Sequence, residues 1–186
     1  MMRAIVTPPV LSPAALSDLK AWLGISTSTD DAELTALLMT ALELCEGFTG
    51  TMPLTATCED TVPACGAWQV LSARPVQAIT GVWMLAVDGT RTALEAEAYA
   101  IDINADGTGA VRLRAPGDPA RAVVRYTAGL AGEWTALPDA LRHGVIRLAA
   151  YHHRERDDTG GGKTAPVAPP AAVSALWRPW RRMRLS

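Results

Sequence analysis

The chain has 186 residues, of which 49% are hydrophobic and 19% charged, a composition typical of a folded globular protein and not of a disordered one. This length is enough for one domain with its own core, with room for a small subdomain. No stretch of about 18 apolar residues occurs, so we expect no membrane span. The first residues lack the apolar stretch of a signal peptide, and we expect the protein to stay in the cytoplasm.

The charge is unevenly distributed along the chain. The net charge is −2, but residues 177–186 carry four arginines and no acidic residue, so the rest of the chain carries −6. An acidic body disfavours general affinity for nucleic acids, whereas a basic C-terminus favours an acidic surface on a partner protein. The cysteines lack the spacing of a metal site and are expected to be reduced thiols; they are Cys45, Cys58 and Cys65.

Two helices are predicted near the start of the chain, over about 12–24 and about 30–49. Leucines recur at helical spacing in both ranges, a polar residue that could cap the first turn precedes each, and a glycine that could end the helix follows each. The expected caps are Ser12 with Pro13 at the first helical position, Asp30 with Glu33 as its capping-box partner, Gly24 and Gly50. Two such helices, joined by a short polar loop, should pack together.

From about 54 to 127 the pattern changes to short apolar runs separated by turn residues, which predicts a small antiparallel sheet. Asp88-Gly89 is expected to form the turn of a hairpin. The stretch 102–107 (DINADG) matches the first half of an EF-hand loop, but Leu113 stands where that loop needs a glutamate. We expect a hairpin turn there, with weak calcium binding as the alternative.

A third helix is predicted from about 138 to 157 because apolar residues recur on one face. The chain should therefore adopt an α+β fold: a small helical bundle, made of two N-terminal helices and a long C-terminal helix, with an inserted small antiparallel β subdomain. Residues 1–158 are expected to form this domain, followed by a Gly/Pro linker over 159–170 and an extended C-terminal tail over 171–186.

Several residue groups resemble catalytic or metal sites without completing them. The sequence GKT at 162–164 resembles the end of a P-loop, but Asp157 stands where that pattern needs a glycine. His152 and His153 would point about 100° apart on a helix and cannot readily share a metal ion. No serine or cysteine lies in a nucleophile motif. We expect a protein that is not an enzyme and holds no cofactor.

The last ten residues, WRPWRRMRLS, combine two tryptophans with four arginines, the residue types enriched at interface hot spots. Three interpretations remain open: the tail folds back on its own domain, lies on a membrane surface, or docks into a neighbouring protein. We favour docking into another protein, with both tryptophans as anchors. The residues expected at this contact are Leu176, Trp177, Arg178, Trp180, Arg181, Arg182, Met183, Arg184 and Leu185.

The order of these segments resembles a known family, the head–tail connector (adaptor) proteins of long-tailed phages and phage-like gene transfer agents. The basic tail also fits this family, whereas the linker 159–170 is longer than its pattern suggests. The segments that carry the resemblance are LSDLKAWL (Leu16–Leu23), Asp30-Asp31 before Leu34–Leu38, CEGFTG (Cys45–Gly50), LSARPVQAITGV (Leu71–Val82), AYAID (Ala98–Asp102), VRYTAG (Val124–Gly129) and LPDALRHGVIRLAAY (Leu137–Tyr151).

The resemblance implies a structural role in the neck of a particle. Such adaptors form a ring, usually of twelve copies, below the portal protein at one capsid vertex. The ring extends the DNA channel and offers a surface to the stopper or tail-completion protein, while the C-terminal segment of each copy reaches the portal. On this basis residues 176–185 would bind the portal.

Two further expectations concern the channel and the alternatives. The acidic body is expected to line the channel, so that DNA passes through without specific binding. The alternative roles are another neck or tail-completion protein, such as a stopper or tail terminator, or a small nucleic-acid-binding module. No membrane partner is expected.

Overall fold

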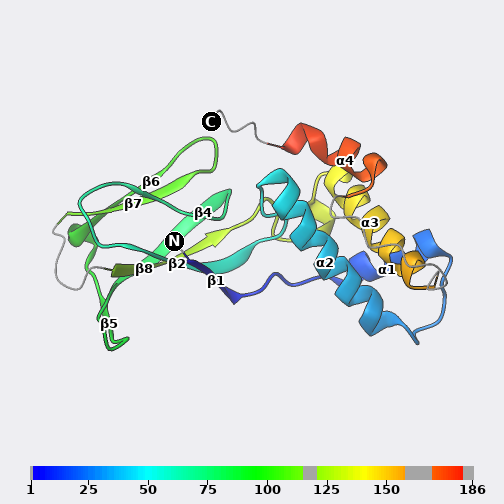
Figure 1. Ribbon diagram of the computed structural model, residues 1–186, viewed down its shortest axis with the longest axis horizontal. Coiled ribbons are helices and arrows are strands. Elements are labelled where there is room, and N and C mark those ends of the chain that lie inside the picture. Colours follow the sequence, from blue (N-terminus) through cyan, green and yellow to red (C-terminus); the bar gives the residue numbers. More distant parts are fainter. Residues whose placement is uncertain (1, 115–120, 158–168, 182–186) are drawn as a thin grey trace. The chain divides into compact units, whose positions relative to one another are not determined.

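The computed structural model describes residues 2–114, 121–157 and 169–181 (Figure 1). These residues form the predicted α+β fold, but with four α-helices where three were expected and two antiparallel sheets where one was expected. Within the same ranges, no helix has the length and apolar character needed to cross a bilayer.

The chain divides into two compact units. The β unit comprises Met1–Pro9 and Leu54–Leu130, and the helical unit comprises Val10–Pro53 and Ala131–Ser186. The β unit therefore contains more than the predicted region from 54 to 127. Its first strand, β1 (Met2–Thr7), comes from the start of the chain and pairs antiparallel with β2, where it covers an otherwise unpaired strand edge.

Three helices of the helical unit lie within one residue of their predicted ends; they are α1 (Pro13–Leu23), α2 (Asp31–Thr49) and α3 (Asp139–Asp157). A fourth helix, α4 (Ala171–Trp177), continues into a 3-10 turn. Helices α1, α2 and α3 all contact one another, and α4 packs on α3 and α2. Their shared core is apolar; it includes Leu19, Leu34, Leu38, Cys45, Trp134, Leu141, Val145, Leu148, Val173 and Trp177.

The helix ends confirm the predicted glycines, and Ser12 and Asp30 occupy the predicted N-cap positions, but neither side chain makes a capping hydrogen bond. Gly24 and Gly50 both adopt the left-handed conformation, with φ of 74° and 70°, which suits a residue without a Cβ. The side chain of Asp30 caps no amide, and its φ and ψ of −103° and 11° are not the extended values typical of an N-cap. Ser12 has the expected extended backbone, but its hydroxyl is buried without a hydrogen-bond partner.

The β unit contains a five-stranded and a three-stranded antiparallel sheet. The larger sheet has the strand order β1-β2-β8-β4-β5 and the smaller one the order β3-β7-β6. The remaining strands are β2 (Ala56–Pro63), β3 (Gln69–Val70), β4 (Val76–Leu85), β5 (Arg91–Ala93), β6 (Tyr99–Ile103), β7 (Gly109–Leu113) and β8 (Arg121–Ala128). Both sheets contribute to the core, which includes Cys58, Val62, Val82, Val111, Leu113, Val124 and Tyr126.

A buried carboxylate joins the larger sheet to the segment between β3 and β4. Asp60 is fully buried and accepts hydrogen bonds from the Ser72 amide, at 2.7 Å, and from the Ser72 hydroxyl. The Tyr126 hydroxyl accepts a hydrogen bond from the Ala73 amide at 3.2 Å. Burial raises the pKa of Tyr126, so its hydroxyl stays protonated. Burying a polar atom without a partner costs free energy, and this network supplies several partners at once.

Both predicted hairpins are present. Gly89 has a φ of 88° in the turn between β4 and β5, where the Thr90 amide donates to the Asp88 carboxylate at 2.9 Å. Gly107 has a φ of 79° in the turn between β6 and β7, where a Cβ would lie 2.5 Å from the Pro75 Cβ. The stretch that resembled an EF-hand loop is thus a hairpin turn. Among the described residues, no group of three or more acidic, histidine or cysteine side chains could hold a metal ion.

Candidate interaction surface at the C-terminus

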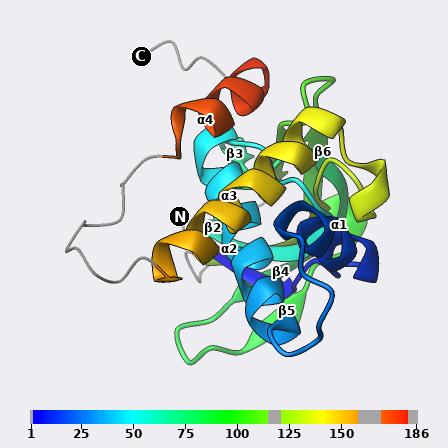
Figure 2. The same cartoon turned by 90° about the vertical axis from the view of Figure 1, so that its right-hand side faces the viewer.

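Helix α4 is attached to its own unit by two buried side chains. Val173 is 2% exposed and Trp177 is 0% exposed, so these two side chains of the short helix face the neighbouring helices. The indole N–H of Trp177 donates a hydrogen bond to the Leu141 carbonyl oxygen of α3 at 3.3 Å. Figure 2 shows α4 lying against α3 and one end of α2.

Leu141 and Gly144 of α3 and Phe48 of α2 form the site that holds the Trp177 ring, which we call its seat. This seat depends on the glycine. A Cβ on Gly144 would overlap the indole nitrogen and lie 2.8 Å from the ring carbon Cδ1. Because Gly144 has no side chain, the indole can approach the backbone of α3 closely enough to reach the Leu141 carbonyl. The Phe48 ring of α2 completes the seat, with its centroid 6.0 Å from that of Trp177.

The prediction that Trp177 anchors the chain in another protein does not fit this structure. The Trp177 ring is fully buried within the helical unit. This is the arrangement expected if the tail folds back on its own domain. A residue before a proline usually has an extended backbone, yet Arg178, which precedes Pro179, is helical with φ of −54° and ψ of −41°. The chain continues through Arg178–Trp180 as a 3-10 turn, so the part of the tail that is described is helical and not extended.

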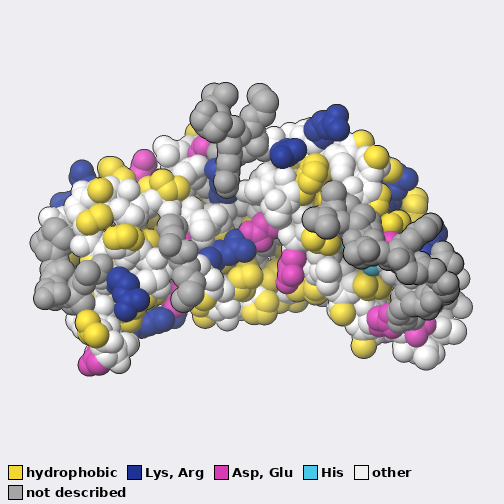
Figure 3. Space-filling model, in the orientation of Figure 1, with side chains coloured by type: hydrophobic (Ala, Val, Ile, Leu, Met, Phe, Trp, Pro, Cys, Tyr) yellow, Lys and Arg dark blue, Asp and Glu magenta, His cyan; other side chains and the backbone are white. Residues whose placement is uncertain are grey.

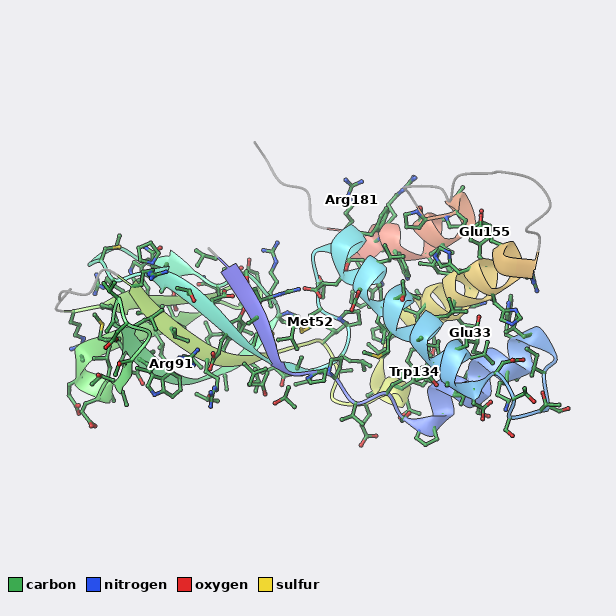
Figure 4. All side chains as sticks on the ribbon, turned by 60° about the horizontal axis from the view of Figure 1, so that its bottom comes forward. Glu33, Met52, Arg91, Trp134, Glu155 and Arg181 are labelled. Carbon is green, nitrogen blue, oxygen red and sulfur yellow. The ribbon has the colours of Figure 1, made fainter. Side chains whose placement is uncertain are left out.

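Beyond the end of α4, the described residues of the predicted contact remain accessible, and we call them the C-terminal surface: Arg178, Trp180 and Arg181. Both arginines are exposed and Trp180 is partly exposed. The guanidinium of Arg181 lies 5.4 Å from the centre of the Phe48 ring. Basic side chains gather at this end of α4 in Figure 3, and Figure 4 labels Arg181 beside the ends of α2 and α4.

The other predicted contact residues add little to the described surface. Leu176 is partly exposed, as Trp180 is, but lies within α4 and before the buried Trp177. Arg182, Met183, Arg184 and Leu185 lie outside the described residues, as do Gly162, Lys163 and Thr164 of the P-loop-like stretch. The structure thus brings two arginines and one tryptophan together and separates Trp177 from them.

A second cluster, on the β unit, has no signal in the sequence. The side chain of Glu59 on β2 is 9% exposed and pairs with Arg125 on β8, at 2.7 Å, and with Arg91 on β5, at 2.9 Å. The Arg125 guanidinium also lies 5.0 Å from the centre of the Trp83 ring. Burial raises the pKa of Glu59, but hydrogen bonds from Arg125 and Arg91 outweigh it, so this pKa lies below its usual value.

This cluster joins strands and has no reactive arrangement. A carboxylate saturated by two guanidinium groups stays ionised and is a weak base.

The buried thiol of Cys45 in α2 is also unreactive, because burial and the nearby Glu46 carboxylate raise its pKa to about 12.

A shallow hollow lies on the helical unit. Trp22 and His143 line it with their rings in an edge-to-face contact, 5.2 Å between centroids. Its volume is about 550 Å³, and Asp18, which also lines it, accepts a hydrogen bond from the Trp134 indole at 2.9 Å. His152 lies elsewhere on α3, with its Nδ1 atom 3.6 Å from Glu155. None of these groups forms a nucleophile–base pair.

Solved structures of known proteins match the fold of this chain over its whole length. No protein-family model and no curated protein sequence matches this chain. Solved structures match it over 100% of its length and 98% of theirs. One is described as the neck of an empty GTA particle computed with C6 symmetry, with a TM-score of 0.80 and 24% identity.

Two further structures agree with the first. A chain of the virion of a native gene transfer agent (GTA) particle has a TM-score of 0.74 and 24% identity. A chain of the neck of a native GTA particle, computed with C12 symmetry, has a TM-score of 0.75 and 25% identity. The chain therefore shares its complete fold with components of gene transfer agent particles.

Proposed function

We propose that this protein is a structural component of the neck of a gene transfer agent or related phage-like particle, where it acts as the head–tail connector (adaptor). The observation that carries this proposal is the similarity of fold over the whole chain to proteins from such particles, at TM-scores from 0.74 to 0.80. Fold alone does not define function. The segment order that resembles the adaptor family points to the same role independently of the coordinates.

The adaptor would act as a ring. The similar neck structures were computed with C6 and C12 symmetry, and twelve copies is the number that the adaptor resemblance implies. A closed ring of identical subunits needs two different, complementary surfaces on each copy. In this role the ring continues the DNA channel below the portal and presents its other end to a stopper or tail-completion protein.

The C-terminal surface is the proposed contact with the portal. Residues 171–181 contain two arginines and no acidic residue, which favours carboxylates or backbone carbonyl groups on the partner. Arginine and tryptophan are also the residue types that contribute most to protein interfaces. Residues 182–185 would extend this contact, and many copies in one ring would strengthen it through avidity if all can engage together.

The negative charge of the chain outside its last ten residues would let DNA pass through the ring. The chain without its last ten residues carries −6, and an acidic channel wall repels the phosphate backbone. DNA would then move through the ring without a specific binding site.

The test is purification together with the portal protein encoded in the same gene cluster, followed by electron microscopy of the complex. The full chain should form a ring stacked on the portal. A variant ending at Arg181 keeps α4 and removes only the last five residues, so it is a better comparison than one that also loses the buried Trp177. A ring found only at the tail side would favour a stopper or terminator, and absence of any complex would overturn the proposal.

A further inference from the structure

We infer that α4 is an internal clamp that holds the C-terminal surface in a fixed place, and that Trp177 is a positioning residue and not a contact residue. This inference rests on the proposed function for the identity of the partner. It assigns different roles to the two tryptophans of the tail, which the sequence alone treats as equivalent anchors.

The contacts of Trp177 carry the first step. Its ring is 0% exposed, and its N–H donates to the Leu141 carbonyl oxygen at 3.3 Å. An aliphatic residue could fill part of the same space but could not donate this hydrogen bond. The missing side chain at Gly144 is what lets the indole reach the backbone of α3. Two residues on separate helices thus fit each other in shape and in hydrogen bonding.

Phe48 links α4 to the C-terminal surface, because its ring contacts both Trp177 and Arg181. Its ring lies 6.0 Å from that of Trp177 and 5.4 Å from the guanidinium carbon of Arg181. The Arg181 amide also donates to the Arg178 carbonyl at 3.1 Å, which closes the 3-10 turn. The position of the accessible arginines is therefore tied to α2 and α3, and no free hinge separates Trp177 from Arg178.

This arrangement has a consequence for binding. Ordering a free peptide on a partner costs conformational entropy, whereas a segment that is already ordered avoids that cost. Arg178, Trp180 and Arg181 would meet the portal as a preformed patch. The matching portal surface would carry acidic side chains beside an apolar recess for the Trp180 indole.

The decisive variant changes the seat and leaves the tail untouched. In Gly144→Ala the new methyl group overlaps the indole of Trp177, so α4 must shift or detach, although alanine itself favours helix α3. Gly47→Ala is the matched control, because a Cβ at this helical glycine of α2 meets nothing within 4 Å. A third variant, Trp180→Ala, removes a proposed contact without touching the seat.

Two measurements on the full-length chain separate the roles. Hydrogen exchange of the α4 amides reports whether the helix is docked, and titration with the purified portal protein from the same gene cluster reports affinity. Gly144→Ala should expose the α4 amides and weaken portal binding by about tenfold or more. Trp180→Ala should weaken binding while the α4 amides stay protected, and Gly47→Ala should change neither.

The possible failures are distinguishable. If wild-type protein does not bind the portal, the proposed function fails, and exchange at α4 still reports on the clamp. If Gly144→Ala releases α4 but binds the portal as tightly as wild type, the tail acts as a free tether and the inference is overturned. If Gly144→Ala does not fold, Trp177→Phe serves instead, since it keeps a ring but loses the donor to Leu141. Unchanged protection of α4 in Gly144→Ala, or in Trp177→Phe where that variant is used, would also overturn the role of Trp177.

Discussion

Glu59 and Arg91 form an ion pair of 2.9 Å even though two strands, β8 and β4, separate their own strands in the sheet. The two residues are also offset along the strands. Arg91 is aligned, through Leu85 of β4, with Arg121 of β8. Glu59 pairs instead with Arg125, four residues further along β8. In a flat sheet the Cα atoms of Glu59 and Arg91 would be about 19 Å apart, given the usual spacings between strands and along them. The pair therefore requires a strongly coiled sheet, and the two register shifts in β4 are irregularities of the kind that increase twist.

Replacing Glu59 should destabilise the β unit. In Glu59→Gln, Arg91 and Arg125 lose their shared partner, and the short strand β5 loses its tie to β2. Because both arginines are about 40% exposed, water screens part of the loss, and we expect a cost of about 1–2 kcal/mol. Urea denaturation measures this cost. Glu97→Gln, at an exposed position, is the control and should change stability by less than about 0.5 kcal/mol.

The same carboxylate should make stability depend on pH. Its pKa in the folded protein lies below the ordinary value of 4.5, so the folded state binds fewer protons than the unfolded state. This contribution is complete above pH 4.5 and disappears as the pH falls through the lower pKa of the folded state. The difference in unfolding free energy between wild type and Glu59→Gln should therefore shrink below pH 4.5. A difference that grows with acidification would contradict the assignment.

Truncation should reveal the structural role of α4. A chain ending at Ala165 loses the buried Val173 and Trp177 and exposes their seat on α2 and α3. Loss of a buried tryptophan alone costs about 3–5 kcal/mol, so the melting temperature should fall by about 10 °C. A chain ending at Arg181 should melt within a few degrees of the full chain. Equal melting of the two truncated chains would show that α4 does not stabilise the unit.

The tyrosine of the β core offers an independent test. Tyr126→Phe removes the hydroxyl that accepts from the Ala73 amide and lies 3.4 Å from the Ser72 hydroxyl. The cost should be about 1–2 kcal/mol, because a buried amide loses its partner. Tyr151→Phe is the control, since its hydroxyl bonds only to the partly exposed Glu155 among the contacts described. A Tyr126→Phe variant as stable as wild type would show that other groups satisfy the Ala73 amide.

Local patterns along the sequence determined a large part of this fold. The leucine spacing of α2 defined that helix to within a residue, because helical periodicity is a property of near neighbours. Gly24, Gly50, Gly89 and Gly107 ended helices or turned hairpins as predicted, since a left-handed backbone favours glycine wherever it occurs. The tail of arginine and tryptophan also stood out by composition alone.

Only the tertiary structure decided which side chains meet across the chain. Trp177 and Trp180 are nearly equivalent in sequence, yet one is buried against Gly144 and the other stays accessible, because the seat is made by α2 and α3 and not by the tail. Glu59 shows no local sign of its two arginine partners, which come from β5 and β8, 32 and 66 residues further along. Contacts of this kind depend on how separate elements pack, and the sequence pattern within any single element does not contain that information.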